Sequence, residues 1–286
     1  MAASRIVAPL YAATAFHLQS LARPHIARAL GLDPEGPQAR ALCRRFLENN
    51  ARARMLELVL TKLEKLGRLE CSSLEGKEHL EAALKLGKGV MTVRGHFFGD
   101  SAANRYLAGA GYPILSIRNL YPADPYESRR PGREAPPDRA EILRRAGINE
   151  VFIQDPECVL KIFARLRSGA LVDVHFDARA RSAARSLPFL GTRRAFPTGF
   201  LRIAFHAGCP VVPMLCLSER RGPKIIFEAP LSGDRGSNAD DYIARNLPVL
   251  AAILERQILS HPDQWVLWAL MGQSEERQKR RDGSGT

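Results

Sequence analysis

The residue types best suited to proton transfer lie in the segment Arg-Gly-His-Phe-Phe-Gly-Asp, residues 94–100. Asp100 follows His96 by four residues, which on a helical turn places both side chains on one face. A carboxylate bonded to one ring nitrogen fixes the tautomer of a histidine and leaves the other nitrogen free as a general base. The spacing predicts a His96–Asp100 catalytic pair. The alternative is a histidine that caps a helix or satisfies a buried polar group.

A second polar segment, Asp173-Val-His175-Phe-Asp177, has the same residue types. Together with His96 and Asp100 it would offer two imidazoles and three carboxylates to a metal ion. That arrangement would suit a metal-dependent hydrolase. We favour a solvated polar loop with one structural aspartate over a metal site, because the later Gly-Asp and Asn-His signatures of metallophosphoesterases are missing.

Both polar segments follow apolar runs typical of buried strands, residues 89–93 and 170–174. Helical patterns alternate with such runs, which predicts an α/β fold, an αβ sandwich with a mainly parallel central sheet flanked by helices. Loops at the carboxyl ends of parallel strands form the sites of such folds. Further strands are expected at 112–117, 150–153, 210–217 and 224–228, and helices at 38–66, 77–86, 101–110, 138–146, 156–166, 198–207 and 240–259.

Two arginine-rich stretches, residues 119–137 and 175–188, interrupt this alternation. The first also holds five prolines and is long for a loop inside a domain, which is typical of functional loops. The second follows a predicted strand directly. We expect both stretches to form a basic rim around the site, with Arg94 and Arg118 at neighbouring strand ends.

The chain is basic, with 42 Lys and Arg against 30 Asp and Glu and a net charge of +12. Such a balance suits nucleic acid, an anionic membrane surface or phosphorylated substrates. The aromatic residues do not alternate with the arginines, which argues against a stacking platform for nucleic acid. Serine-hydrolase, phosphate-loop and dinucleotide-binding motifs are absent from the sequence.

The N-terminus carries a short apolar run at residues 6–16, broken by Pro9. It is too short to span a bilayer, which takes about 20 apolar residues. A helix here either lies in a membrane interface or packs on the domain. We therefore expect a membrane-associating helical segment at 1–35, a main domain at 36–272 and a polar, disordered tail at 273–286.

A series of short motifs also occurs in a characteristic order between residues 42 and 268. They are Arg44-Arg45-Phe46, Gly76-Lys77-Glu78-His79-Leu80, Gly87-Lys88-Gly89-Val90, Gly95-His96-Phe97, Arg118-Asn119-Leu120-Tyr121-Pro122, Leu171-Val172-Asp173, Pro188-Phe189-Leu190-Gly191, Pro197-Thr198-Gly199, Ala207-Gly208-Cys209-Pro210 and His261-Pro262-Asp263-Gln264-Trp265. The ordered set resembles the bacterial lipid A biosynthesis acyltransferase family, the lauroyl and myristoyl transferases.

The resemblance implies an αβ sandwich that moves a fatty acyl group from acyl carrier protein or coenzyme A to a hydroxyl of a lipid or glycolipid. His96 would deprotonate the acceptor hydroxyl, which then attacks the thioester. Arg118 would contact phosphate or position the donor. Phe189 and Gly191 would shape the acceptor or acyl groove.

The sequence departs from the family at the acid, which usually follows the histidine by five residues. Ser101 occupies that position here, and Asp100 lies one residue early. Either a shifted helix start lets Asp100 serve, or a distant acid such as Asp173 or Asp177 does, or the catalysis of this chain is changed. Our leading assignment is His96 with Asp100, with Asp173 in reserve.

Asp177 and Arg194 complete the expected substrate-binding residues. We expect no cofactor and no nucleic acid partner. The expected partners are an acyl thioester, a lipid or glycolipid acceptor and an anionic membrane surface. The expected location is the cytoplasmic face of the bacterial inner membrane, held peripherally or by one N-terminal anchor. A non-catalytic basic membrane-binding module is the remaining alternative.

Overall fold

The protein is built around a seven-stranded sheet, seen in a computed structural model that describes residues 2–119, 139–178, 183–233, 236 and 238–271. Five adjacent strands run parallel, and β9 and β1 at one edge run in the opposite direction. The predicted mainly parallel sheet is therefore confirmed. In spatial order the strands are β1 (Ser73–Glu75), β9 (Pro223–Phe227), β8 (Val211–Ser218), β2 (Val90–Arg94), β5 (Leu171–His175), β3 (Ile114–Arg118) and β4 (Ile148–Phe152).

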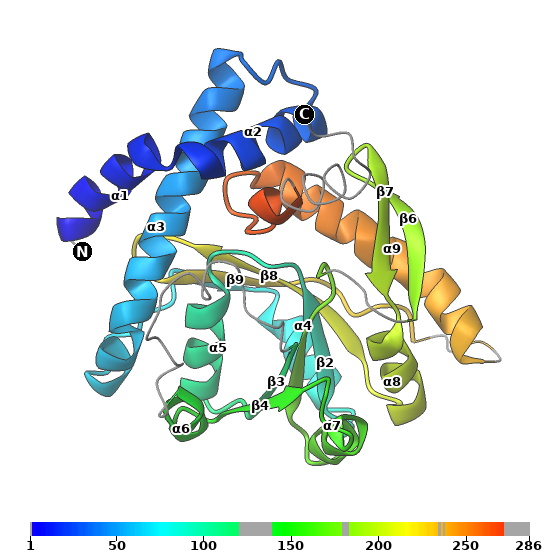
Figure 1. Ribbon diagram of the computed structural model, residues 1–286. Coiled ribbons are helices and arrows are strands. Elements are labelled where there is room, and N and C mark those ends of the chain that lie inside the picture. The colour runs from blue at the N-terminus through cyan, green and yellow to red at the C-terminus, as the bar shows by residue number, and fades with distance from the viewer. Residues whose placement is uncertain (1, 120–138, 179–182, 234–235, 237, 272–286) are drawn as a thin grey trace.

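Helices cover both faces of this sheet (Figure 1). Because side chains alternate along a strand, successive residues of β2 enter different cores. Val90 packs with the helices of one face, whereas Met91 and Val93 pack with those of the other. The first face carries α4 (Lys77–Leu84), α5 (Asp100–Gly109) and α6 (Arg139–Arg145), and the second carries α7 (Cys158–Arg167), α8 (Gly199–Ala207) and α9 (Ala239–Ser260).

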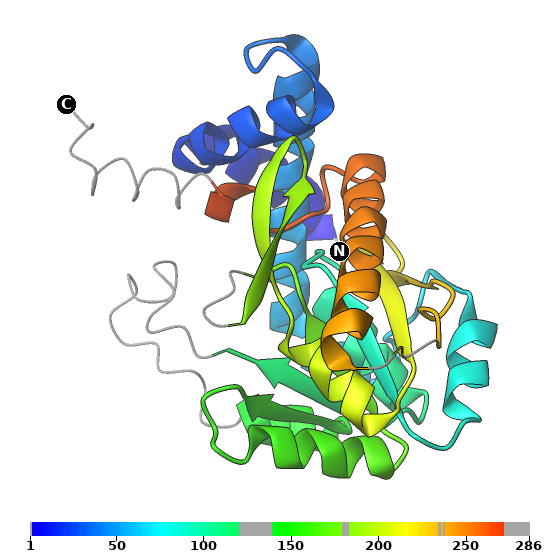
Figure 2. The ribbon, with the colours of Figure 1, turned by 90° about the vertical axis from the view of Figure 1, so that its right-hand side faces the viewer.

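Three further helices precede the sheet: α1 (Ala2–Thr14), α2 (Phe16–Leu30) and α3 (Pro37–Lys65). Both α1 and α2 pack against the long α3, and Figures 1 and 2 show them crossing its upper part. The apolar run at 6–16 is thus divided between two helices. Within the described residues, no helix combines the length and the apolar character needed to cross a bilayer.

The stretch at 175–188, predicted as a loop, contains regular structure instead. His175 ends β5, and β6 (Ala184–Phe189) forms an antiparallel hairpin with β7 (Thr192–Pro197). The two turn residues, Leu190 and Gly191, both have positive φ, as tight hairpin turns require. The prediction was wrong for residues 184–188, because the charge of the segment concealed its alternation of exposed and half-buried residues.

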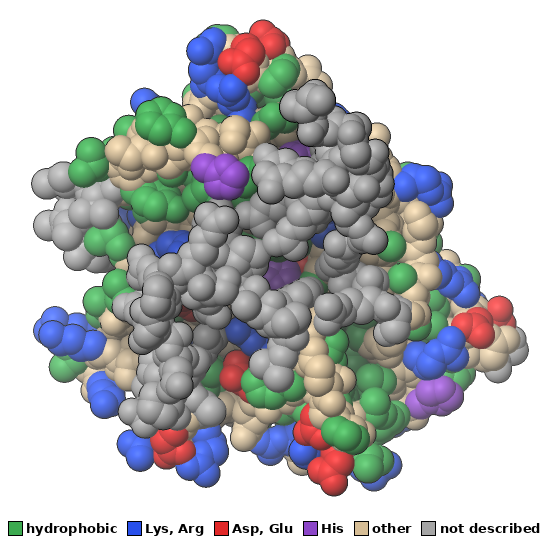
Figure 3. Space-filling view, viewed as in Figure 1, with side chains coloured by type: hydrophobic (Ala, Val, Ile, Leu, Met, Phe, Trp, Pro, Cys, Tyr) green, Lys and Arg blue, Asp and Glu red, His purple; other side chains and the backbone are tan. Residues whose placement is uncertain are grey.

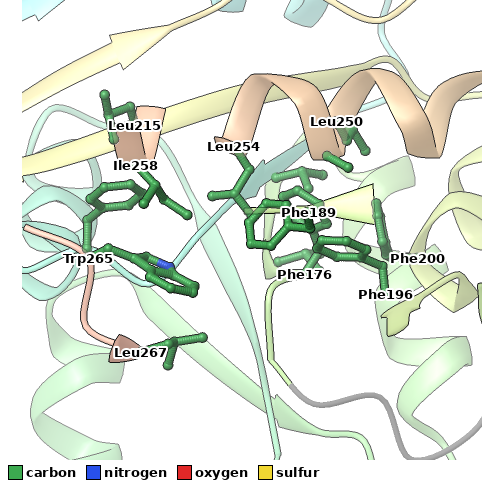
Figure 4. Close-up of a cluster of buried hydrophobic side chains, with 14 of the residues drawn as sticks. Phe176, Phe189, Phe196, Phe200, Leu215, Leu250, Leu254, Ile258, Trp265 and Leu267 are labelled. Carbon is green, nitrogen blue, oxygen red and sulfur yellow. The ribbon is translucent and has the colours of Figure 1, made fainter. Parts of the chain in front are cut away.

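The hairpin is held by an aromatic cluster beside α9 (Figure 4). Phe189 meets Phe196 edge to face at 5.1 Å, and Phe176 stacks obliquely on Phe196 at 5.7 Å. Trp265 adds a further edge contact to Phe189. This packing fixes the hairpin next to the end of β5. The predicted loop at 119–137, apart from its first residue, and the predicted tail at 273–286 lie outside the described residues.

Candidate active site

The register between β2 and β5 brings two polar segments together. Arg94, the last residue of β2, pairs with His175, the last residue of β5, and the amide of Phe176 donates to the carbonyl of Arg94. Two residues beyond this pair, the chains present His96 and Asp177. The site therefore lies at the carboxyl ends of two central parallel strands, as the sequence predicted.

His96 and Asp177 form a short hydrogen bond, with 2.5 Å between Nδ1 of the ring and Oδ1 of the carboxylate. An ionised carboxylate only accepts hydrogen bonds, so the ring carries its proton on Nδ1. Nε2 then keeps its lone pair. The side chain of His96 is 33% exposed, whereas that of Asp177 is fully buried. A histidine of this tautomer, open on one side, is built to accept a proton at Nε2.

Asp177 is held by donors from three directions. Its Oδ2 accepts the backbone amide of His96 and the indole Nε1 of Trp265, each at 2.8 Å. Arg194 donates to the carbonyl oxygen of Asp177 and lies over the Trp265 ring. Burial alone would raise the pKa of Asp177, but the charge of His96 and the side-chain hydrogen bonds from His96 and Trp265 outweigh it and hold that pKa well below its ordinary value.

The same carboxylate governs the proton affinity of His96. Enclosure by protein would lower the pKa of the His96 imidazole, and the charge of Arg94 acts in the same direction. The charge and hydrogen bond of Asp177 outweigh both, with help from Asp100, so the pKa of His96 is raised above its ordinary value. The site therefore stabilises the imidazolium that forms when the ring accepts a proton.

Asp100, predicted as the partner of His96, contacts His175 instead. Its Oδ2 lies 2.9 Å from Nε2 of His175 and accepts the amide of Phe97 at 3.0 Å. The prediction assumed a helical turn through His96, but α5 begins only at Asp100. His96 lies between the end of β2 and the start of the helix, so the four-residue spacing does not bring the two side chains onto one helix face.

Asp173, the reserve acid, lies deeper in the same polar layer. Its Oδ2 lies 2.6 Å from Nη2 of Arg94 and also accepts the amide of Asn104 at 3.0 Å. Burial opposes ionisation, but the Arg94 charge outweighs it and lowers the pKa of Asp173. Nη1 of Arg94 also lies 3.3 Å from Oδ1 of Asp100. Arg94 is completely buried, which corrects its expected place on the rim of the site.

Two glycines let the chain turn through this crowded region. A Cβ added at Gly95 would lie 2.5 Å from a methyl of Leu254 and 3.0 Å from Oδ2 of Asp177. A Cβ at Gly99 would lie 2.5 Å from the backbone of Leu217. A Cβ at Gly99 would collide with backbone, and one at Gly95 would force Leu254 to move, so both glycines allow the strand end of β2 and the start of α5 to approach their neighbours closely.

The residues predicted to bind substrate are spread over different surroundings. Phe189 is buried in the aromatic cluster, and Gly191 occupies the exposed hairpin turn. Arg194 donates to the backbone carbonyl oxygen of Asp177. Arg118 ends β3, is 40% exposed and lies 3.4 Å from Glu150. Of this set, the structure brings Asp177 to His96 directly and Arg194 to Asp177.

The five side chains considered as metal ligands divide into separate contacts. His96 binds Asp177, His175 binds Asp100, and Asp173 pairs with Arg94. Across the described ranges, no three His, Cys, Asp or Glu side chains are grouped so that they could hold a metal ion. The side chains that the alternative hydrolase would need as metal ligands therefore have partners within the protein instead.

Sequence reasoning missed the role of Trp265, the residue that anchors Asp177. The segment around it runs beside the histidine, because the amide of Phe98 donates to the carbonyl of Gln264 and that of Val266 to the carbonyl of His96. The only sequence signal was the motif His261-Pro262-Asp263-Gln264-Trp265, to which no function was attached. The motif and residues 96–98 are far apart in the sequence, so no local pattern indicates their contact.

Comparison with known proteins places the chain in a family. The model of the bacterial lipid A biosynthesis acyltransferase family matches residues 4–270, nearly the whole length. A search of curated proteins finds no match to the chain. The family match includes both strand ends that form the site and the Trp265 segment that supports it. The chain therefore belongs to the bacterial lipid A biosynthesis acyltransferase family and is an acyltransferase.

Proposed function

We propose that this acyltransferase takes its acyl group from a thioester of acyl carrier protein or coenzyme A, and that His96 is the general base. The acceptor would be a hydroxyl of a lipid or glycolipid. The observation that supports this most is the 2.5 Å contact between His96 Nδ1 and the buried Asp177, with the ring itself one-third exposed. It combines a fixed tautomer with access for a substrate.

The proposed reaction uses this geometry in the following way. Nε2 of His96 accepts the proton of the acceptor hydroxyl while the oxygen attacks the thioester carbonyl. The new carbon–oxygen bond forms, the carbon–sulfur bond breaks, and the imidazolium returns its proton to the leaving thiolate. The products are an ester and a free thiol, and the ring ends as it began.

Asp177 acts through His96 in this scheme. It stays ionised because its pKa is low, holds the proton on Nδ1 and stabilises the imidazolium. Trp265 and the His96 amide fix the direction of the carboxylate. The ring is therefore held in one orientation, with Nδ1 bonded to Asp177 and Nε2 available to accept a proton. General base catalysis of this kind contributes about 10²–10⁴-fold to a rate.

We propose that the protein acts at a membrane surface. The described part of α1 and α2 exposes Leu10 and Phe16, which are 64% and 73% accessible, and Figure 3 shows hydrophobic side chains over this region. Exposed apolar side chains on short helices, together with a net charge of +12, suit peripheral binding to an anionic lipid surface.

The test is acyl transfer by the purified protein from an acyl thioester to a glycolipid acceptor. His96→Ala is expected to lose about 10²-fold or more of kcat while remaining folded. His206→Ala, which removes an exposed histidine of α8, is the matched control and should retain wild-type rates. Full activity in His96→Ala would refute the proposed base.

A further inference from the structure

We propose that His175 is a positioning residue: an uncharged ring, held by Asp100, that supports His96 while His96 carries the transferred proton. This inference rests on the proposed role of His96 as the base. It assigns a purpose to a second histidine–carboxylate pair that the reaction itself leaves unused.

The two imidazole rings lie face to face. Their centroids are 4.2 Å apart, and their planes differ by 30°. His175 is only 10% exposed, so its ring forms a fixed surface against one side of His96. Since Asp177 holds Nδ1 and His175 covers a face, the base has little freedom to rotate away from a bound hydroxyl. Correct orientation of this kind is a large part of catalysis.

His175 is itself fixed at its far nitrogen. Asp100 Oδ2 lies 2.9 Å from Nε2 and simultaneously accepts the Phe97 amide, which anchors the carboxylate at the start of α5. A carboxylate accepts, so Nε2 of His175 carries the proton and Nδ1 has the lone pair. His96 has the opposite tautomer. The site thus contains two stacked imidazoles whose protons are assigned by two different aspartates.

The charges around the rings favour a proton on His96 rather than on His175. The groups that face His175 are His96, Arg94 and Asp100, with Asp173 and Asp177 nearby. Burial, His96 and Arg94 lower the pKa of His175, and together they outweigh Asp100. Two imidazoliums 4.2 Å apart would repel strongly in this enclosed site, so protonation of one ring excludes protonation of the other.

An uncharged His175 supports the proton transfer to His96, whereas a charged His175 would not. When His96 becomes imidazolium, a neutral aromatic ring beneath it provides a polarisable face, and cations bind favourably over such faces. A cationic His175 would instead oppose the proton transfer. Asp100 and Arg94 therefore serve the base indirectly, the first by orienting His175 and the second by disfavouring its charge.

The primary experiment is NMR titration of protein labelled with ¹⁵N-histidine, comparing wild type with His175→Phe. In the wild type we expect His175 to remain neutral with its proton on Nε2 while His96 titrates above it. In His175→Phe, which keeps a flat ring, the midpoint of His96 should stay within about half a pH unit. A His175 that titrates above His96, or a rise in the His96 midpoint in His175→Phe, would overturn the proposal.

The kinetic experiment separates positioning from simple structural support. His175→Ala should lower kcat about tenfold or more with little change in KM, whereas His175→Phe should lower it less than about threefold. Equal losses in both folded variants, or wild-type kcat in His175→Ala, would contradict the inference. Asp100→Asn gives a second variant if His175→Ala does not fold, and its His175 should lose the single-tautomer signal.

These readouts also distinguish the inference from the proposed function. The NMR titration needs no turnover, so it decides the state of His175 even if the protein moves no acyl group from either thioester. Normal acyl transfer by His96→Ala would refute the base, whereas the state of His175 is decided by the titration of the wild-type protein alone. Conversely, a protonated His175 in an active enzyme would refute only the inference.

Discussion

Nδ1 of His96 lies 2.5 Å from Oδ1 of Asp177, a residue 81 positions later in the chain. His96 and this carboxylate come from different strand ends, and their meeting depends on the pairing of Arg94 with His175 between β2 and β5. Ser101 at the position usual for the family acid therefore does not leave the histidine without a carboxylate. Asp177 supplies it from the neighbouring strand.

Removal of the Asp177 charge should cripple the enzyme without unfolding it. We expect Asp177→Asn to lower kcat about 10²–10⁴-fold, because an amide neither fixes the Nδ1 proton nor stabilises the imidazolium. Steady-state acyl-transfer rates measure this. The control is Asp240→Asn, which changes a carboxylate that is 65% exposed on α9. Full activity in Asp177→Asn together with loss in Asp173→Asn would relocate the acid.

The pH dependence should reflect the raised pKa of His96. The base acts when neutral, so kcat/KM is expected to fall as the pH drops through a midpoint above the ordinary value of 6.5. In Asp177→Asn the residual activity should keep its acid limb but at lower pH, because the charge and hydrogen bond that raise the pKa are gone. If the acid limb of kcat/KM in Asp177→Asn stays at its wild-type pH, the assignment of Asp177 as the partner of His96 is contradicted.

Arg94 should be a stability residue rather than a substrate contact. Arg94→Met leaves the buried Asp173 and the partly buried Asp100 without their cation, and breaking a buried pair such as Arg94–Asp173 costs about 3–5 kcal/mol. Urea unfolding gives the free energy. The comparison is Arg144→Met, which breaks an exposed pair with Glu141 and should cost far less, because solvent screens such a pair. Equal losses in the two variants would show that the Arg94 network is not stabilising.

Gly99→Ala should destabilise the junction between β2 and α5. Its Cβ would lie 2.5 Å from the Leu217 backbone, which cannot move aside cheaply, and overpacking of this kind costs about 1–3 kcal/mol. Gly109→Ala, at the other end of α5, meets nothing within 4 Å and should be neutral or slightly stabilising. Thermal unfolding of the two variants tests this contrast. A lower unfolding midpoint for Gly109→Ala than for Gly99→Ala would contradict the prediction.

Binding to anionic vesicles should depend on the exposed residues of α1 and α2. The double variant Leu10→Ser, Phe16→Ser is expected to sediment several-fold less with phosphatidylglycerol vesicles, because the apolar anchor is lost. Leu160→Ser changes a residue that is 70% exposed on α7 and serves as the control. A larger loss in Leu160→Ser would place the membrane contact on the α7 side.

The sequence by itself determined the layers of the fold and the region of the site. Apolar runs alternating with helical patterns placed β2–β5, β8, β9 and the helices from α3 onward within a few residues, because burial of continuous runs and amphipathic faces is a local property. The short β1 and the β6–β7 hairpin were not predicted. The position of His96 after β2 followed from the same pattern. Even the alternation of Thr92, Arg94 and His96, and of Asp173, His175 and Asp177, can be read from the printed residues.

The tertiary structure alone decided which of these side chains meet. A shift of one residue in the pairing of two strands would turn each polar set to the opposite face of the sheet, so the partner of His96 depends on a long-range register rather than on spacing. The start of α5 at Asp100 sent that carboxylate to His175. The contact of Trp265 with Asp177 likewise exists only because distant segments pack together, and it orients the carboxylate that meets His96.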